Sequence, residues 1–263
     1  MNINVLTLFP KMLNSSFQEG VVGQAFLRGL LNIQALNPRD FAEDKHKSVD
    51  DKPFGGGDGM VMSLDPLTKA FSSIPEGQRG PVIYLTPQGQ LWTDAKAKSY
   101  AKNSDSITLV CGRYGGIDQR FINHFVTEEI SIGNYVLSGG ELAAMVLIDS
   151  LARYIPGVLG NLNSVEQESF SQGYLEAPLF TRPNGHTLGT VPEFLTSGHH
   201  LRIEQMRKAV GVIRTLCLRP DLLRLRFDEL ENYRALVLRL SNQDLEVLGL
   251  QREQILKLKS FLP

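Results

Sequence analysis

The chain has 263 residues, of which 42% are hydrophobic and 21% charged, and its formal net charge is −1 at pH 7. This composition is that of an ordinary globular protein, and the length allows one large domain or two smaller ones. No apolar run reaches the roughly 18 residues of a membrane-spanning helix, and the N-terminus lacks the basic opening of a signal peptide. Two isolated cysteines, Cys111 and Cys217, do not form a disulfide framework. We therefore expect a cytoplasmic protein with no membrane partner.

The first 160 residues alternate apolar runs typical of strands with amphipathic runs typical of helices. Strands are predicted at residues 2–8, 32–37, 81–85, 107–111 and 126–132. Helices are predicted at residues 21–31, 63–73, 93–102, 117–124 and 139–155. This alternation favours an α/β fold with a mostly parallel sheet covered by helices.

Two segments of this part stand out. The polar loop from Pro38 to Gly59 ends in a glycine-rich run, and a connection of this length is usually functional or mobile. The helix predicted at 139–155 is apolar on most sides, so it is expected to be buried against the sheet, against a second subunit, or against both.

The strand pattern disappears beyond Pro178. Helices are predicted at 201–217 and 243–261, from apolar positions at helical spacing. The stretch before them has few periodic apolar positions and is predicted to be a linker. The expected organisation is an α/β domain, a linker and a small all-α domain, at residues 1–160, 161–175 and 176–263.

Positive charge is concentrated near the C-terminal helices. Residues 202–226 hold seven cations and two anions, a local excess of five positive charges. Such a segment is either a solvated helix face or a surface that contacts phosphates.

Three glycine-rich turns, at residues 84–89, 111–116 and 132–140, each follow a predicted strand. In an open α/β sheet such turns lie at the carboxyl ends of the strands, where ligands bind. Together they predict one composite pocket whose walls are largely backbone. Backbone donors and acceptors can bind the edges of an adenine, and carbonyl groups tolerate a sulfonium cation.

Several common chemistries find no support in the motifs. The glycines at 112–116 do not have the dinucleotide-binding spacing, and the chain contains no P-loop. His199 and His200 are adjacent, which is poor spacing for two metal ligands on one helix. The flanking glycines around Ser138 do not form a nucleophile elbow.

The same turns belong to a longer series of motifs. The motifs are Cys111-Gly112-Arg113-Tyr114, Gly116-Ile117-Asp118, Ser131-Ile132-Gly133-x-Tyr135-Val136-Leu137-Ser138-Gly139-Gly140-Glu141, Arg153-x-Ile155-Pro156-Gly157-Val158-Leu159-Gly160, Gly55-Gly56-Gly57-x-Gly59-Met60, Ser169-Phe170, Thr181-Arg182-Pro183 and Leu195-x-Ser197-Gly198-x-His200. In these motifs, over nearly the whole chain, the sequence resembles the bacterial tRNA (guanine-N1)-methyltransferases of the TrmD family, which belong to the SPOUT class.

The resemblance implies an S-adenosylmethionine enzyme whose sheet carries a trefoil knot, and a homodimer with each active site at the interface. It implies methylation at N1 of the tRNA guanosine at position 37, just 3′ of the anticodon, which preserves the reading frame. Residues 1–160 would bind the cofactor, 161–175 would complete the active site, and 176–263 would bind tRNA. Family members have been described as needing magnesium, although no residue here identifies a metal site.

The resemblance also implies which residues form the sites. The cofactor is expected against Tyr84, Leu85, Thr86, Pro87, Gly112, Ser131, Ile132, Gly133, Asn134, Tyr135, Val136, Leu137, Gly139 and Gly140. The tRNA is expected against His200, Arg202, Arg207, Lys208 and Arg214.

Guanine N1 carries a proton near neutral pH, so the reaction needs a general base there and a cation or donor at O6, where negative charge accumulates. The resemblance assigns the base to Glu168 and the O6 stabiliser to Arg153, with Glu166 as a nearby alternative carboxylate. Relatives usually carry aspartate at the position of Glu168, so the carboxylate is retained but is one methylene longer.

Two further departures remove negative charge near the expected cofactor. Gly115 stands where the family usually has glutamate, and Asn134 where it usually has aspartate. Asp118 or Glu141 could compensate. Two other interpretations therefore stay open: a SPOUT methyltransferase that acts on another RNA atom, such as a ribose 2′-hydroxyl, and a non-catalytic RNA-binding relative.

Overall fold

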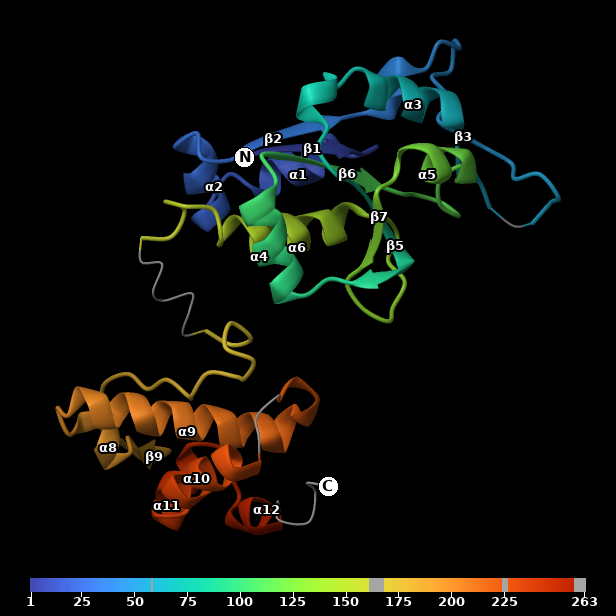
Figure 1. Cartoon of the computed structure of the whole chain (residues 1–263). Coiled ribbons are helices and arrows are strands. Elements are labelled where there is room, and N and C mark those ends of the chain that lie inside the picture. The colour runs from blue at the N-terminus through green and yellow to red at the C-terminus, as the bar shows by residue number, and fades with distance from the viewer. Residues whose placement is uncertain (58, 161–167, 224–226, 258–263) are drawn as a thin grey trace. The chain divides into compact units, whose positions relative to one another are not determined.

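The computed structural model describes residues 1–57, 59–160, 168–223 and 227–257. Contacts divide the chain into two units, Met1–Leu162 and Asn163–Pro263, and each unit is described by itself (Figure 1). No helix in these described ranges is long and apolar enough to cross a membrane.

The first unit is an α/β structure. In chain order its elements are β1 (Asn2–Leu6), α1 (Pro10–Ser16), α2 (Gly20–Leu27), β2 (Asn32–Leu36), the 3₁₀ turn η1 (Pro38–Phe41), β3 (Asp50–Asp51), β4 (Val61–Met62), α3 (Leu64–Ser72), the 3₁₀ turn η2 (Glu76–Gln78), β5 (Val82–Leu91), α4 (Asp94–Asn103), β6 (Ser106–Cys111), α5 (Gln119–Phe125), β7 (Glu128–Ser131) and α6 (Glu141–Ala152). Five of the strands form one parallel sheet in the order β2-β1-β6-β5-β7, and β3 and β4 form a separate two-residue ladder. The predicted mostly parallel sheet is confirmed.

Alternate side chains of each strand enter two separate hydrophobic cores. Ile83 and Leu85 pack in one core with α1, α2 and α6, whereas Val82 and Tyr84 pack in the other with α3 and α5. Figure 1 shows α4 and α6 on one side of the sheet and α3 and α5 on the other. Because successive side chains point to opposite faces, a strand covered on both faces must be apolar throughout, as the sequence of β5 is up to Leu85.

Strand β5 differs from its sequence-based prediction. The turn expected at 84–89 is absent, and the strand continues to Leu91 with a register shift against β7 between Leu85 and Gln90. At Gly89 a Cβ atom would lie 2.3 Å from the backbone nitrogen of Ile130. Position 89 therefore requires glycine because two backbones approach closely in an irregular strand pair, and not because the chain turns there.

Helix α6 is only partly covered within its own unit. Its buried side chains include Leu147, Ile148 and Leu151, which belong to the core shared with α1 and α2. Leu142 and Val146 lie one turn apart on another side and are 49% and 47% exposed. The helix therefore packs on the sheet with one face and keeps a second apolar face at the surface.

The second unit is mainly helical. Its elements are β8 (Gly185–His186), β9 (Gly189–Thr190), α8 (Glu193–Thr196), α9 (His200–Leu218), the 3₁₀ turn η3 (Pro220–Leu222), α10 (Phe227–Val237), α11 (Asn242–Val247) and α12 (Arg252–Lys257). Buried Val210, Ile213 and Leu245 join a third hydrophobic core in this unit. The antiparallel ladder β8–β9 lies where the sequence indicated no strand, because two-residue strands are too short to show a period.

The prediction of one long helix at 243–261 is wrong. The segment is divided into α11 and α12, and Gly249 between them has a φ of +69°, which ends the first helix. Residues 258–261 of that prediction lie outside the described residues.

Candidate active site

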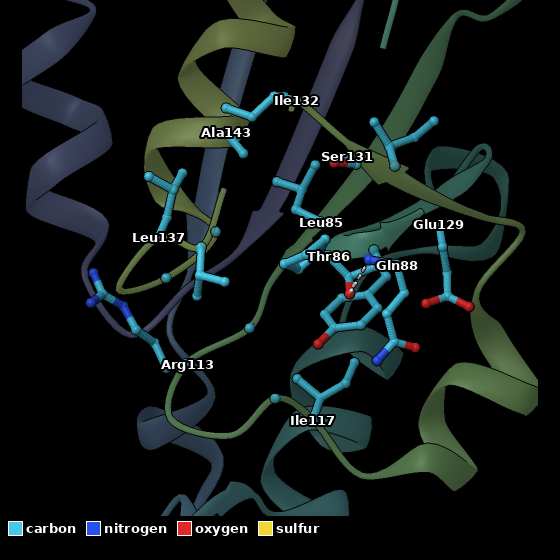
Figure 2. Close-up of a pocket in the computed structure, with 18 of the residues that line it drawn as sticks. Leu85, Thr86, Gln88, Arg113, Ile117, Glu129, Ser131, Ile132, Leu137 and Ala143 are labelled. Atoms are coloured by element: carbon cyan, nitrogen blue, oxygen red, sulfur yellow. Dashed lines mark hydrogen bonds between the residues drawn. The ribbon is translucent and has the colours of Figure 1, made fainter. Parts of the chain in front are cut away.

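A cavity of about 500 Å³ lies at the carboxyl ends of β6 and β7 and beside the middle of β5. Figure 2 shows residues that line it. Three segments that are far apart in the sequence form most of its wall. The lining residues are 84–88, 112–117, 129–133 and 135–140, with Gln119, Ile122 and Ala143. The composite pocket expected from the glycine-rich segments is therefore present.

All residues that the resemblance assigned to the cofactor line this cavity, except Asn134, which is exposed outside it. The structure thus brings these segments together, although their binding of a cofactor stays a prediction. Several side chains that line the cavity were not predicted from the sequence, namely Gln88, Arg113, Tyr114, Gln119, Ile122 and Glu129. Arg113 and Tyr114 lie within a glycine-rich turn, so that turn was the signal that could have identified them.

Two of the lining loops are held together by backbone contacts. The backbone nitrogen of Gly140 donates to the carbonyl oxygen of Gly112 at 3.0 Å, and Arg113 forms a β-bridge with Gly139. A Cβ atom at Gly140 would lie 2.7 Å from the Cα atom of Cys111, so the approach is possible because the residue is glycine. The start of α6 is thereby fixed against the end of β6.

A buried ion pair reinforces this junction. The Nη2 atom of Arg113 lies 2.9 Å from the Oε2 atom of Glu141, as a charge contact rather than a well-aligned hydrogen bond. The other carboxylate oxygen, Oε1, accepts a hydrogen bond of 2.8 Å from the hydroxyl of Thr7. The guanidinium also donates to the carbonyl oxygen of Ser138 at 3.0 Å and lies 4.4 Å from the ring centroid of Phe9. The pair therefore joins the chain after β1, the chain after β6 and the start of α6.

These contacts correct two expectations about compensating carboxylates. The side chain of Glu141 is 1% exposed and is held by Arg113, so it is not available to a ligand. Asp118 lies outside the cavity lining, where it caps α5 and bonds Arg120; that hydrogen bond lowers the pKa of its carboxyl group. Among the described lining residues the one carboxylate is that of Glu129, which was not predicted from the sequence.

The side chain of Tyr84, which lines the cavity, and that of Cys111, which is buried next to the lining residue Gly112, are kept neutral. Burial raises the pKa of Tyr84, and its register partner Glu129 acts in the same direction. Burial raises the pKa of the Cys111 thiol well above its usual range, and the charge of Glu141 adds to the effect. A thiol that stays protonated is a poor nucleophile, so Cys111 is a packing residue.

The two residues assigned to catalysis do not line this cavity. Arg153 follows the last residue of α6, whereas Gly140, at the cavity, precedes the first. A 12-residue helix rises about 18 Å, so Arg153 and the cavity lie at opposite ends of α6. Glu168 belongs to the second unit, and Glu166 lies outside the described residues.

The residues assigned to RNA contact are all on α9. His200 and Arg202 are exposed near its start. Lys208 lies 5.7 Å from the ring centroid of Tyr233, and a hydrogen bond to that tyrosine raises the pKa of the lysine. Arg214 donates a hydrogen bond to the carbonyl oxygen of Leu248, so its guanidinium has a structural contact, and RNA contact by it stays a prediction.

The described residues contain no group of three or more histidine, cysteine, aspartate and glutamate side chains that could hold a metal ion. Magnesium therefore has no support from the arrangement of these side chains.

Comparison with known proteins gives one consistent result. The family model described as tRNA (Guanine-1)-methyltransferase TrmD matches residues 1–225. A tRNA (guanine-N(1)-)-methyltransferase of Ruminiclostridium cellulolyticum is 48% identical over 234 residues, which cover 88% of this chain and 98% of that relative. Proteins of the same name from Shewanella sediminis and Lachnospira eligens are 51% and 46% identical, covering 85% and 84% of this chain and 93% and 94% of those relatives.

The buried ion pair leads to a prediction about stability. Replacing Glu141→Gln leaves the guanidinium of Arg113, 17% exposed, without its counter-charge, and is expected to lower the free energy of unfolding by about 3 kcal/mol. Glu43→Gln is the matched control, because Glu43 is 83% exposed in its ion pair with Lys69, and no measurable change is expected. Urea unfolding followed by circular dichroism measures both. Equal stability of the two variants would contradict the role of the pair.

Proposed function

This chain belongs to the tRNA (guanine-1)-methyltransferase TrmD family, and we propose that it methylates N1 of the guanosine at position 37 of tRNA with S-adenosylmethionine as the methyl donor. The observation that carries the proposal is the family match over residues 1–225, supported by relatives of that name at about 50% identity. The modified guanosine lies beside the anticodon, where methylation preserves the reading frame. The free thiols of Cys111 and Cys217 agree with a cytoplasmic location.

The cavity fits the proposed donor in size and in the chemistry of its walls. Its volume of about 500 Å³ is within the usual range of small-molecule sites, roughly 300–1,000 Å³. The backbone of residues 131–140 would hold the adenosine, with Tyr84 and Leu85 beside it. When bound, S-adenosylmethionine supplies an electrophilic methyl group on a positively charged sulfur.

The positive charge of the sulfonium would be stabilised by a nearby carboxylate. This chain has Gly115 and Asn134 where the family usually has carboxylates, and a Cβ atom at Gly115 would lie 3.1 Å from the carbonyl oxygen of Met60. We propose that Glu129, the carboxylate in the described lining, supplies the negative charge. Its position on β7 places it at the same edge of the sheet as the glycine-rich segments.

Methylation of guanine at N1 requires two groups of the protein. A carboxylate at position 168 would remove the proton from N1 of guanine, which makes the nitrogen nucleophilic. The guanidinium of Arg153 would stabilise the negative charge that develops on O6. Correct placement of the two reacting atoms supplies much of the remaining rate, so the extra methylene of Glu168 matters through its reach.

We propose that these groups act in a homodimer. Arg153 lies about a helix length from the cavity of its own chain, so a cavity completed by the partner subunit's Arg153 accounts for the distance. The exposed apolar side chains of Leu142 and Val146 on α6, and of Phe26 and Leu27 on α2, would supply a contact surface for a second copy. The linker at 161–175 would bring Glu168 to the site and close over cofactor and RNA.

The trefoil knot of the SPOUT class is also a proposal for this chain. Its support is the path after β7, which lies at the edge of the sheet. From there the chain returns past β5 to the end of β6, where Gly139 and Gly140 contact Arg113 and Gly112.

A methyl-transfer assay tests the function directly. With a tRNA transcript that carries guanosine at position 37, nucleoside analysis is expected to show 1-methylguanosine, and a transcript with adenosine there should remain unmodified. Recovery of a 2′-O-methylated nucleoside would assign the enzyme to another RNA atom. Binding of tRNA without any methylated product would favour a non-catalytic relative.

The general base has its own test. Glu168→Gln keeps the shape of the side chain but cannot accept the N1 proton, so methylation is expected to fall by about 100-fold or more. Glu168→Asp retains the carboxylate that relatives carry and should remain active. Calorimetry with S-adenosylmethionine is expected to give similar affinities for both variants. Full activity of Glu168→Gln would remove this residue from the mechanism.

Complementation between two inactive variants tests the shared site. Arg153→Ala removes the O6 stabiliser, and Gly112→Val fills the cavity, since a Cβ atom there already lies 2.9 Å from the hydroxyl of Tyr84. If Arg153 acts across the interface, a mixed dimer contains one intact site, and random assortment of the two chains should restore about one quarter of wild-type activity. Each variant purified alone serves as the control. No recovery in the mixture would place Arg153 in its own chain's site.

A further inference from the structure

The second unit contains a cavity of about 660 Å³, and one of its lining residues is Arg207, which is expected to contact tRNA. It lies between the chain that follows Pro178 and the N-terminal half of α9. Its lining combines an apolar part, formed by residues such as Phe180, Leu195 and Ile203, with the side chains of Arg182 and Arg207.

The apolar part of the lining is attached to a packed core. Phe180 and Leu195 are partly buried against the hydrophobic core of this unit, which includes the fully buried Val210 and Ile213. Their positions are thus fixed by packing rather than by a ligand. Leu179, also in the lining, is 69% exposed and offers apolar surface to whatever enters.

The two arginines give the cavity a positive charge. In the part of the chain that the structure describes, neither Arg182 nor Arg207 has an ion pair or a side-chain hydrogen bond. Arg202 and Lys208 extend the positive charge along α9, opposed by Glu204. An uncommitted guanidinium beside an aromatic and aliphatic surface is the combination that binds a phosphate and the base attached to it.

We propose that this cavity binds one nucleotide of the substrate RNA, with the base against Phe180, Leu195 and Leu179 and a phosphate at Arg182 and Arg207. The identity of that RNA as tRNA rests on the proposed function. An unpaired base stacks on aromatic side chains in many RNA-binding proteins, whereas a surface that holds only phosphates needs no apolar recess. The nucleotide is distinct from the guanosine that is methylated, which belongs at the cavity of the first unit.

The test measures tRNA binding to the full-length protein by fluorescence anisotropy at several salt concentrations. Arg182→Gln and Arg207→Gln are each expected to weaken binding and to reduce the slope of log K against log salt by about 1, because each removes one phosphate contact. Arg239→Gln is the matched control: it removes the same charge from an exposed residue of the same unit outside the cavity, and should leave binding unchanged.

A second pair of variants separates base contact from charge. Leu179→Ser is expected to weaken binding about 5-fold with no change in the salt slope, because an uncharged surface is lost. Leu188→Ser is its control, since Leu188 is 89% exposed and does not line the cavity. Both leucines are at the surface, so thermal unfolding should be unchanged.

The outcomes distinguish this inference from the proposed function. If the arginine variants bind as Arg239→Gln does, or Leu179→Ser binds as Leu188→Ser does, the nucleotide site is overturned even when 1-methylguanosine is formed. Absence of tRNA binding by the wild-type protein overturns it as well. If all three cavity variants weaken binding while the wild-type protein makes no 1-methylguanosine, the cavity stands and the proposed reaction fails.

Discussion

The buried contact between Arg113 and Glu141 is the interaction on which the geometry of the first cavity depends. A carboxylate that is almost fully buried is unfavourable unless it is paired and hydrogen-bonded, so Glu141 holds both Arg113 and Thr7 in place. These three residues come from three separate parts of the sheet edge. Fixing them together sets where the loops after β6 and β7 lie, and thus the shape of the space between them.

The cavity wall combines backbone groups of the glycine-rich segments with side chains such as those of Tyr84, Gln88 and Leu137. Two ion pairs near the cavity join Arg113 with Glu141 and Arg120 with Asp118, and the buried thiol of Cys111 is kept neutral by its raised pKa. A wall of amides and carbonyls can bind a flat heterocycle by its edges without introducing charge. Under the proposed function, Glu129 supplies the negative charge that relatives usually have at the positions of Gly115 and Asn134.

The cavity and the remaining chemical groups are separated along the chain. The cavity lies at the N-terminal end of α6, and Arg153 follows the C-terminal end of that helix. Some apolar side chains of α6 are buried in the core, and others are exposed at the surface. In the proposed homodimer, the cavity of one copy would be completed by Arg153 of the partner subunit. The second unit has an apolar recess beside Arg182 and Arg207, which make no ion pair with the described residues, and we propose that this recess binds RNA.

Much of this organisation could be predicted from the sequence alone. Periodicity located the sheet strands, because apolar side chains such as those of Ile83 and Leu109 must be buried wherever the strand lies. The order of the glycine-rich motifs indicated the family, and with it the reaction. Tertiary structure decided the irregular pairing of β5 around Gly89, the burial of Glu141, the division of the last helix at Gly249, and the contact that Arg214 makes with Leu248. Those features depend on contacts between residues that are distant in the sequence. Local sequence patterns indicate secondary-structure propensity and burial, but they do not indicate which distant residue a side chain will contact.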